Sequence, residues 1–448
     1  MLRRSDVARW TGRLALTLCA WAASSSLALA ADGPKPGDRI DRDTWQKAEG
    51  LLPPEILRHY REGEYANPVV EWKEGSYHWS PEFREQSAAN RGKFDVDADG
   101  GIVEKATGKQ PARIYGYPFP DVQPTDPQAA LKILWNYFYI TLSFGNLHAE
   151  SQVNWVSPTG LERRTDQDVR FFYYDGQVES ESPENPQNLQ SQQLIVARKP
   201  NDLNGTAALA WRSRDPKKRD SAWAFVPALR RVRSVSPSNR SDGFLGSDMS
   251  QDDGPFFDGK PEDFTWTFKG EVEQLRFVDP LSLEGKSNSK WQPGGGWRAF
   301  WPEDLKMLGY QDSDWKGVAW APISGALAKR KFYVIEGIPK DQYYLFGRIE
   351  LFIDKETFQG AWNRKFDWKG ELLTSMQVMA FDLQPYTRPD GRVDYIQGSN
   401  MAFQAAENVK ANRATVAGLK SSPNAAFDVR APFSANEFTV DALSRVGK

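Results

Sequence analysis

The chain has 448 residues, of which 40% are hydrophobic, 13% aromatic and 26% charged, and its formal net charge at pH 7 is −2. This composition excludes a disordered chain, a collagen-like chain and a disulfide-stapled miniprotein. No basic stripe dominates the sequence, so we expect no nucleic-acid partner.

The first thirty residues have the pattern of a secretory signal peptide. A basic stretch ends at Arg13, residues 14–23 are apolar, and residues 28–30 read Ala-Leu-Ala, the small-x-small pattern of a signal-peptidase site. The single cysteine, Cys19, lies inside the apolar run after a leucine, which is not the position of a lipid-modified cysteine. The sequence therefore predicts a signal peptide over residues 1–30 and a periplasmic mature chain that is neither a lipoprotein nor membrane-spanning.

An N-terminal extension of helical and irregular segments is expected over residues 31–125. Apolar residues recur at helical spacing as far as about residue 63 and are interrupted by the helix-breaking pair Pro53-Pro54. Residues 64–125 are rich in Tyr, Pro and Gly and show no steady period. This pattern predicts two short helices followed by irregular chain.

One acidic run in the extension invites a metal-binding interpretation. Residues 95–100 have the oxygen spacing that begins an EF-hand calcium loop. Ala106, however, occupies the position where that loop needs a bidentate Glu. An acidic turn is therefore favoured over a calcium site.

A long apolar helix is predicted over residues 127–148. Asp126 and Pro127 provide an N-cap acid and a proline at the first helical position. The following apolar residues recur at three- and four-residue spacing and extend over most of the helix surface. Such a helix must be buried on most sides, either across a sheet or in the mouth of a cavity.

After residue 149 the hydrophobic period changes to two. Apolar and polar side chains alternate over residues 264–268, and Ile349, Leu351 and Ile353 alternate with Arg348, Glu350 and Phe352, as a half-buried antiparallel sheet requires. The sequence thus predicts a mainly β (α+β) fold, in which residues 126–405 form a large curved antiparallel sheet or incomplete barrel covered by the long helix. Residues 406–448 have few large apolar side chains and are expected to wrap the surface.

The sequence shows no motif of nucleophilic, metal or cofactor chemistry. Its three histidines, His59, His78 and His148, lie in separate segments, and His148 is interpreted as a partner of the C-terminal end of the long helix. We therefore expect a protein that is not an enzyme, with no catalytic residue, no metal and no cofactor.

The charges of residues 212–263 are segregated. Residues 212–233 are rich in Arg and Lys, whereas residues 236–263 are rich in Asp and Glu. The acidic loop can fold back on the basic strands through Arg–carboxylate pairs, and two separate solvated faces are the alternative.

The same segment resembles a known group of proteins. An aromatic-proline strand over residues 224–233 runs into an Arg-rich turn, and a loop with Phe-Leu-Gly-Ser-Asp follows within residues 241–253. Both features resemble the signature of outer-membrane lipoprotein-sorting proteins. Over almost its whole length the chain is also similar to the family of domain of unknown function 1329, through residues 115–120, 134–137, 347–354 and 362–370.

The resemblance implies a fold like the periplasmic lipoprotein carrier and its outer-membrane receptor, an incomplete barrel whose concave apolar face shelters acyl chains. It also implies a hydrophobic or lipid-like ligand, and an inner-membrane exporter and outer-membrane components as partners. The residues that we expect to line or cover the cavity are Trp135, Phe138, Leu142, Trp211, Trp266 and Phe268. The residues expected to form its rim loop are Arg231, Arg233, Asp242, Asp248, Asp252 and Asp253.

The primary hypothesis is therefore a periplasmic binding or carrier protein for a lipid-like ligand or a lipidated protein. One alternative is an envelope glycan-binding protein or glycosidase, because the chain has 17 Trp residues and candidate carboxylates at Glu350, Asp354 and Glu356. A second alternative is a non-enzymatic docking subunit of an export assembly. The identity of the ligand and the oligomeric state are left open.

Overall fold

The computed structural model describes residues 33–446 except for a set of short gaps, and the predicted signal peptide and His78 lie outside the described residues. The gaps are residues 77–78, 179–181, 237–239, 286–287, 293, 295, 301, 303, 383–384, 388–389, 392, 395–398 and 419–426.

Strands are the dominant regular structure of the described chain. Eighteen strands join in one 18-stranded sheet, and two further pairs of short strands stand apart from it. The strands are β1 (Arg39–Ile40), β2 (Asn67–Val70), β3 (Phe94–Val96), β4 (Ile102–Glu104), β5 (Leu147–Ser157), β6 (Gly160–Tyr173), β7 (Leu189–Lys199), β8 (Ala207–Ser213), β9 (Ser221–Val226), β10 (Arg231–Val235), β11 (Phe264–Val278), β12 (Asn288–Trp291), β13 (Trp297–Phe300), β14 (Ala326–Pro339), β15 (Arg348–Asp354), β16 (Gly360–Phe366), β17 (Leu372–Asp382), β18 (Tyr386–Thr387), β19 (Val393–Asp394), β20 (Ser399–Asn408), β21 (Arg413–Gly418) and β22 (Phe427–Val429). The α-helices are α1 (Pro54–Glu62), α2 (Pro81–Ala89), α3 (Ala129–Ser143), α4 (Pro280–Leu283) and α5 (Val440–Val446).

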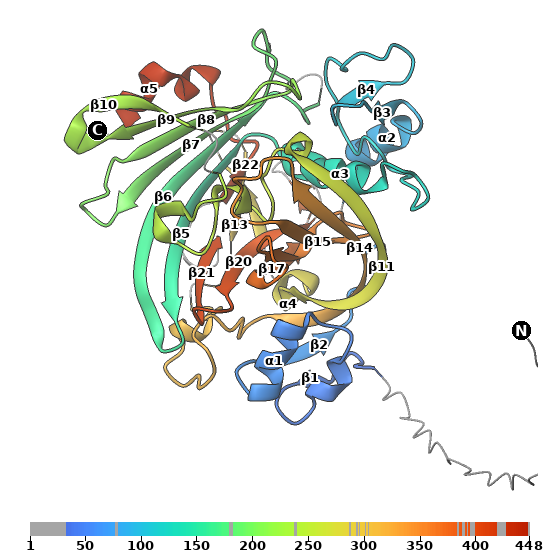
Figure 1. Ribbon diagram of the computed structural model, residues 1–448, viewed down its shortest axis with the longest axis vertical. Coiled ribbons are helices and arrows are strands. Elements are labelled where there is room, and N and C mark those ends of the chain that lie inside the picture. The colour runs from blue at the N-terminus through green and yellow to red at the C-terminus, as the bar shows by residue number, and fades with distance from the viewer. Residues whose placement is uncertain are drawn as a thin grey trace, which may run out of the picture.

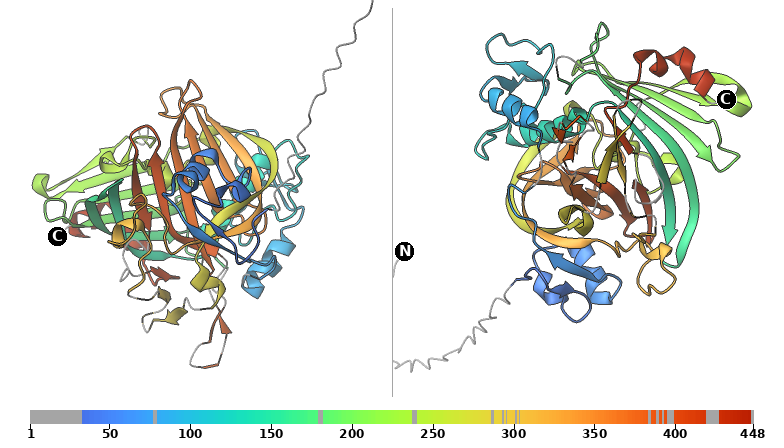
Figure 2. Two further views of the ribbon diagram at one scale, coloured as in Figure 1. Left: turned by 90° about the horizontal axis from the view of Figure 1, so that it is seen from below. Right: turned by 180° about the vertical axis from the view of Figure 1, so that it is seen from behind.

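The large sheet has two parts that meet at its middle. Strands β10, β9, β8, β7, β6 and β5 follow one another in antiparallel order and form a curved arm. From β5 the sheet continues through β21, β20, β17, β16, β15 and β14 to β11. This second part curls until β11 meets β17 at one residue pair, and Figures 1 and 2 show the arm curving away from it. The predicted curved, mainly antiparallel sheet is confirmed, with β2 and β17 adding parallel pairs.

Helix α3 lies where the predicted covering helix was placed. It begins at Ala129, three residues after Asp126, whose Oδ1 accepts the backbone N–H of Gln128 at 2.8 Å. Almost all of its side chains are buried, the polar Asn136 among them, whose amide pairs with both backbone groups of Phe119. A helix that is apolar on most sides is therefore enclosed on most sides, as its sequence indicates.

The N-terminal extension is attached to the curled part of the sheet. Strand β2 pairs with β14 in parallel, and His59 of α1 lies between two carboxylates. Its ring nitrogens are 2.6 Å from Glu64 and 2.6 Å from Glu407 of β20. These contacts raise the pKa of His59 despite the opposing effect of its burial. Helix α1 is thus fixed to the sheet by charge as well as by packing.

The C-terminal segment differs from its prediction. Strand β21 pairs with both β20 and β5, so that residues 413–418 lie inside the sheet rather than around it. The strand is short and built of small residues, which is why its sequence carries no strong apolar period. Beyond Val429 the chain covers a surface, where Phe438 and Leu443 pack on the outer face of the arm.

Candidate ligand cavity

The arm has two faces that carry side chains of different size. On its outer face Phe172, Val196 and Phe225 are buried against Phe438 and Leu443 of the C-terminal segment. Because side chains alternate along a strand, their neighbours in sequence face the opposite way, toward α3 and the rest of the sheet. Figure 1 shows α5 on the outer side of β8, β9 and β10.

The face of the arm that points toward the rest of the sheet carries small side chains on β8 and β9. Ala208 and Ala210 of β8 lie directly opposite Ala224 and Ala222 of β9 in the strand register. All four line a cavity of about 390 Å³, which lies within the size range of small-molecule binding sites. The alanines leave this space open because their side chains are too short to fill it, although Leu209 of β8 and Trp223 of β9 also border it.

The remaining walls of the cavity are mostly apolar. They come from the C-terminal end of α3, from the inner face of β5 to β7, from β20 and β21, and from residues 240–258, which we call the cover loop. Apolar lining residues include Phe144, Leu147, Val153, Val169, Phe171, Ile195, Phe244, Met249, Met401 and Phe427. The cavity can therefore accept an apolar chain, although polar side chains also line it, among them Gln167, Gln193, Asp220, Arg240, Asp253 and Gln404.

A buried ion pair fixes the cover loop to the curled part of the sheet. Lys365 of β16 pairs with Asp253, and each side chain is 1% exposed. The loop is held further by Gln404, whose Nε2 donates to the Asp253 carbonyl at 2.6 Å and whose Oε1 accepts the Phe256 N–H at 2.7 Å. Asn363 donates to the Phe256 carbonyl at 2.7 Å. These contacts hold the cover loop in place as one wall of the cavity.

A second charged cluster joins the cover loop to the arm. Arg240 is 2.5 Å from Asp252 and 3.1 Å from Asp258, and Arg212 of β8 pairs with Asp258 at 2.8 Å and Asp220 at 3.1 Å. Burial alone would lower the pKa of Arg240, but the surrounding carboxylates hold it above its ordinary value. Burial raises the pKa of Asp258 by more than the two arginines lower it. Arg240 and Asp220 also line the cavity, and their charges mark its polar end.

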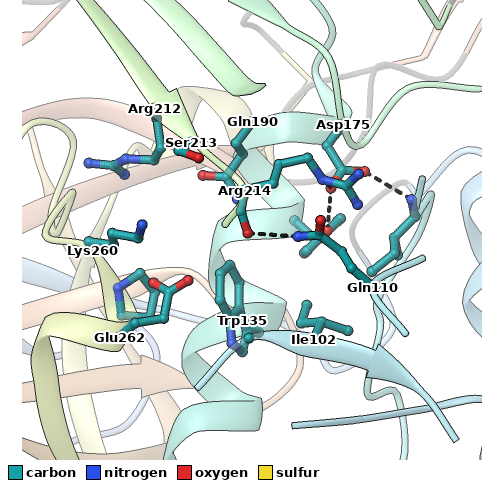
Figure 3. Close-up of a pocket in the computed structure, with 14 residues that line it drawn as sticks. Ile102, Gln110, Trp135, Asp175, Gln190, Arg212, Ser213, Arg214, Lys260 and Glu262 are labelled. Carbon is teal, nitrogen blue, oxygen red and sulfur yellow. Dashed lines mark hydrogen bonds and ion pairs between the residues drawn. The ribbon is translucent and has the colours of Figure 1, made fainter. Parts of the chain in front are cut away.

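Two smaller hollows lie beside α3. One of about 40 Å³ is lined by Phe138 and Leu142 together with the Arg212–Arg240 cluster. The other, of about 20 Å³, is polar, and Figure 3 shows Trp135 and Glu262 at its edge. A space of this size holds about one water molecule and no acyl chain.

The polar hollow contains one unusual carboxyl group. Glu262 is buried, its Oε2 has no hydrogen-bond partner among the described residues, and burial raises its pKa to about 7. The nearby cations are engaged elsewhere: Arg214 pairs with Asp175 at 3.1 Å, and Lys260 donates to two backbone carbonyls. The hollow is therefore a packing site of the fold rather than an extension of the large cavity.

None of the six aromatic and leucine residues predicted to line the cavity is among its lining residues. Trp135 borders the polar hollow, and Phe138 and Leu142 border the 40 Å³ hollow. Trp211 points to the outer face, where its Nε1 donates to the Phe438 carbonyl at 2.9 Å.

The two remaining predicted cavity residues lie on β11. Trp266 packs against Phe257 and donates from Nε1 to the Pro261 carbonyl, and Phe268 packs against Tyr333. The alternation of side chains along a strand identifies its two faces but does not show which face points inward. Large side chains also fill space, so they are poor markers of a cavity.

Only some of the charged residues predicted to form the rim loop make ion pairs in the structure. Asp248 pairs with Arg413 at 3.1 Å, and Asp252 and Asp253 pair with Arg240 and Lys365. Asp242 is exposed. Arg231 and Arg233 are exposed on β10 and make no ion pair with any described residue. The acidic loop does fold back onto basic residues, as expected, through Arg212 of the basic segment and through Arg240, but not onto Arg231 or Arg233.

The carboxylates considered for glycan cleavage are engaged in ion pairs. Glu350 pairs with Arg364 at 2.7 Å, while Asp354 and Glu356 both pair with Arg330. No described residues form a group of three or more His, Cys, Asp or Glu side chains able to hold a metal ion.

The acidic run of the extension forms turns and ion pairs. Asp97 Oδ1 accepts the N–H groups of Asp99 and Gly101 at 2.9 Å each, and Asp95 pairs with Lys132 at 2.7 Å. These contacts are those of an acidic turn.

His148 does not cap the long helix, because the helix ends five residues earlier. It lies on β5 between Asp168 of β6, at 3.6 Å, and Asp428 of β22, at 3.2 Å. The neighbours of His148 on either side, Leu147 and Ala149, line the cavity. The nearby carboxylates of Asp168 and Asp428 raise the pKa of His148 to about 9.

Stability should therefore depend on the protonation of His148. Because its pKa is raised from 6.5 to about 9, its contribution is complete below pH 6.5 and is lost as the pH rises through 9. We expect about 2 kcal/mol, after allowance for solvent screening. Urea unfolding of wild type and His148→Gln across this range measures it. The two curves should converge above pH 9, and a constant difference would contradict the assignment.

The fold and the cavity together define a mainly β protein with a largely apolar space bordered by a helix and a loop. The chain belongs to the DUF1329 family, described as proteins of unknown function, whose pattern matches residues 39–444. The membership indicated by the sequence motifs is thereby confirmed. No curated protein matches the sequence.

Several solved structures are similar to this chain. A putative outer membrane lipoprotein-sorting protein domain from Vibrio parahaemolyticus has 15% identity and a TM-score of 0.45, over 71% of this chain and 100% of that one. A DUF1329 family protein from Desulfovibrio piger has 15% identity and a TM-score of 0.42 over the same shares. A LolA superfamily protein from Nitrosomonas europaea has 11% identity and a TM-score of 0.37, over 68% and 97%.

No helix in the described parts of residues 33–446 combines the length and the hydropathy that a bilayer span requires.

Proposed function

We propose that the protein is a periplasmic binding or carrier protein for a lipid-like ligand or the acyl part of a lipidated protein. The observation that supports it is the cavity of about 390 Å³ beneath the alanine face of β8 and β9. Each methylene group moved from water into such a space gains about 0.8 kcal/mol. An acyl chain crossing an aqueous compartment therefore needs a shelter of this kind.

The polar end of the cavity suggests how such a ligand is oriented. Arg240 and Asp220 line the wall near the cover loop, and the rest of the lining is mostly apolar. An acyl chain would lie along β5 to β9, with its polar end toward this charged cluster. The periplasmic location rests on the predicted signal peptide, and an exporter of the inner membrane is the partner that we propose for loading.

Filling the cavity should abolish ligand binding without unfolding the protein. Ala210 and Ala222 face each other across β8 and β9, so Ala210→Leu together with Ala222→Leu places two isobutyl groups in the open space. We expect at least tenfold weaker binding of a dansyl-labelled fatty acid, measured by fluorescence titration. Native mass spectrometry of the wild type after mild extraction should show a co-purifying lipid, which the double variant lacks.

The matched control is Ala89→Leu, which adds the same group at an exposed position of α2. It should bind the probe like the wild type. Equal binding by the double variant would contradict the cavity as the binding site. A wild type that is always recovered empty and binds no probe, yet stays in a stable complex with an envelope protein, would favour the docking subunit instead.

A further inference from the structure

Strand β10 is the outer edge of the arm, and its exposed side chains are unlike the rest of the surface. Among the described residues it pairs only with β9, and Figure 1 shows it at the end of the arm away from β11. Residues 226–235, which we call the β10 strip, comprise the end of β9, the turn and β10. The strip contains three arginines and no acidic residue.

The three arginines of the strip carry uncompensated charge. Arg230, Arg231 and Arg233 are exposed and make no ion pair with any described residue. By contrast, the arginines that face the cavity or the cover loop, such as Arg212 and Arg240, are paired with carboxylates. The chain as a whole has a net charge of −2, so the strip is a local positive site on an otherwise acidic protein.

Exposed apolar side chains are interspersed with these charges. Leu229 is 51% exposed, Val226 36% and Val235 39%. Leu229 stands at the tip of the hairpin, because the short 3-10 turn at residues 227–229 ends in Arg230 with a left-handed φ of 47°. Basic side chains beside exposed aliphatic ones are the composition that binds the interface of an anionic bilayer.

The position of the strip relates it to the cavity. Val235 is at once exposed and part of the cavity wall, and it lies opposite Ala222 in the strand register. The cavity therefore reaches the surface at β10. A bilayer in contact with this strand would lie against the mouth of the cavity.

We propose that the β10 strip is a docking surface for an anionic lipid bilayer. Arg231 and Arg233 attract the acidic headgroups, and Leu229 enters the interfacial region of the bilayer. The proposal goes beyond ligand binding, but it rests on the proposed carrier function. Docking would align the cavity mouth with the membrane that supplies or receives an acyl chain.

Vesicle sedimentation of the full chain tests this surface. The wild type should bind vesicles that contain phosphatidylglycerol and should not bind vesicles of phosphatidylcholine alone. Arg231→Gln together with Arg233→Gln should weaken binding about 25-fold, at about fivefold for each arginine near the surface. Added salt should weaken wild-type binding, because it screens exposed charges.

The matched control is Arg39→Gln with Arg61→Gln, which removes the same charge from partly exposed positions in the N-terminal extension. It should sediment like the wild type, and an equal loss would overturn the assignment to β10. A wild type that stays in the supernatant with both vesicle types would also overturn it.

Arginines on an edge strand can have a second role, which predicts a different result in the vesicle experiment. Charges on an edge strand discourage pairing with another sheet, in which case the double variant would aggregate and the wild type would bind no vesicle. That result would overturn the proposal. Binding that appears only when an envelope protein is added to the vesicles would assign the strip to a protein partner and overturn it as well.

Fatty-acid titration without vesicles separates this proposal from the carrier function. Arg231→Gln with Arg233→Gln should bind the dansyl probe as the wild type does, because neither arginine lines the cavity. If neither the wild type nor any variant binds the probe, the carrier function is contradicted. The vesicle experiment would still decide whether the β10 strip binds a bilayer.

Discussion

Replacing Lys365 by methionine is expected to lower the free energy of unfolding by about 3–5 kcal/mol. Methionine keeps much of the volume of the lysine stem but removes its charge. The Asp253 carboxylate is then left buried, with the Ser250 backbone N–H, at 2.7 Å, as its remaining hydrogen-bond donor among the described residues. An uncompensated buried charge is costly because it can regain its hydration only if the structure opens. Urea unfolding measures the loss.

The consequence should reach the cavity, because Asp253 lies in its wall. We expect the cover loop to open locally in Lys365→Met, so that amide hydrogen exchange at residues 247–258 becomes faster and binding of the dansyl probe weaker. The exposed Lys369, in the turn after the same strand, provides the matched control. Lys369→Met should change stability by less than about 0.5 kcal/mol.

A second substitution separates loss of charge balance from loss of packing. Lys365→Met with Asp253→Asn removes both charges and keeps an oxygen that can accept the Ser250 N–H. The double variant should recover more than half of the lost stability. If instead the two losses add, the residues do not interact, and the anchoring of the cover loop by this ion pair is contradicted.

The fold was largely predictable from the sequence because it depends on periodicity. The 3.6-residue period of α3 and the two-residue period of strands such as β11 and β15 are strong where large apolar side chains repeat. Strand β21 shows where this reasoning stops: Ala414, Val416 and Gly418 alternate with residues of similar size, so its burial follows from its partners β20 and β5 rather than from its own sequence.

The cavity was not predictable by the same reasoning. Large side chains such as Trp211 and Trp266 were taken as its lining because they are the conspicuous residues of their strands, yet they are the ones that fill space. The informative signal is a repeat of small side chains rather than of large ones. Ala208 and Ala210 on one strand, and Ala222 and Ala224 on the next, repeat small residues at every second position, which marks a strand face that leaves room.

Charge partners were also beyond the reach of the sequence. The segregated charges of residues 212–263 correctly indicated that the acidic loop folds back onto bases. Which bases it meets depends on the register of the arm, which brings Arg212 beside Asp258, and on the path of the cover loop, which turns Arg240 inward. Arg231 and Arg233 are close in sequence to these residues but are exposed and make no ion pair with any described residue.

The second large effect is expected for Asp354→Ala, at about 3–5 kcal/mol. Asp354 pairs with Arg330 at 2.9 Å and with Arg276 at 3.5 Å. Arg276 is fully buried, and burial lowers its pKa to about 10. Removing the carboxylate leaves this guanidinium without a counter-ion, with the carbonyl of Gly360 as its remaining acceptor among the described residues.

The loss should extend to the N-terminal extension, because both guanidinium groups lie over the ring of Trp72, at 5.6 Å and 4.6 Å from its centre. Arg330 also donates to the Trp72 carbonyl at 3.2 Å. We therefore expect limited proteolysis of Asp354→Ala to cut between residues 70 and 80 before the sheet unfolds. Asp202→Ala, at an exposed site, is the control and should resist proteolysis as the wild type does.

Removing both charges tests whether the effect is electrostatic. Asp354→Asn with Arg276→Met leaves Arg330 paired with Glu356, at 2.6 Å, and replaces the most deeply buried cation by an apolar side chain. Buried ion pairs are often replaced by neutral groups at little cost, so this variant should be more stable than Asp354→Ala and should keep residues 70–80 protected. A loss below about 1 kcal/mol in Asp354→Ala itself would mean that water reaches Arg276, and that the extension is held by packing around Trp72 rather than by charge.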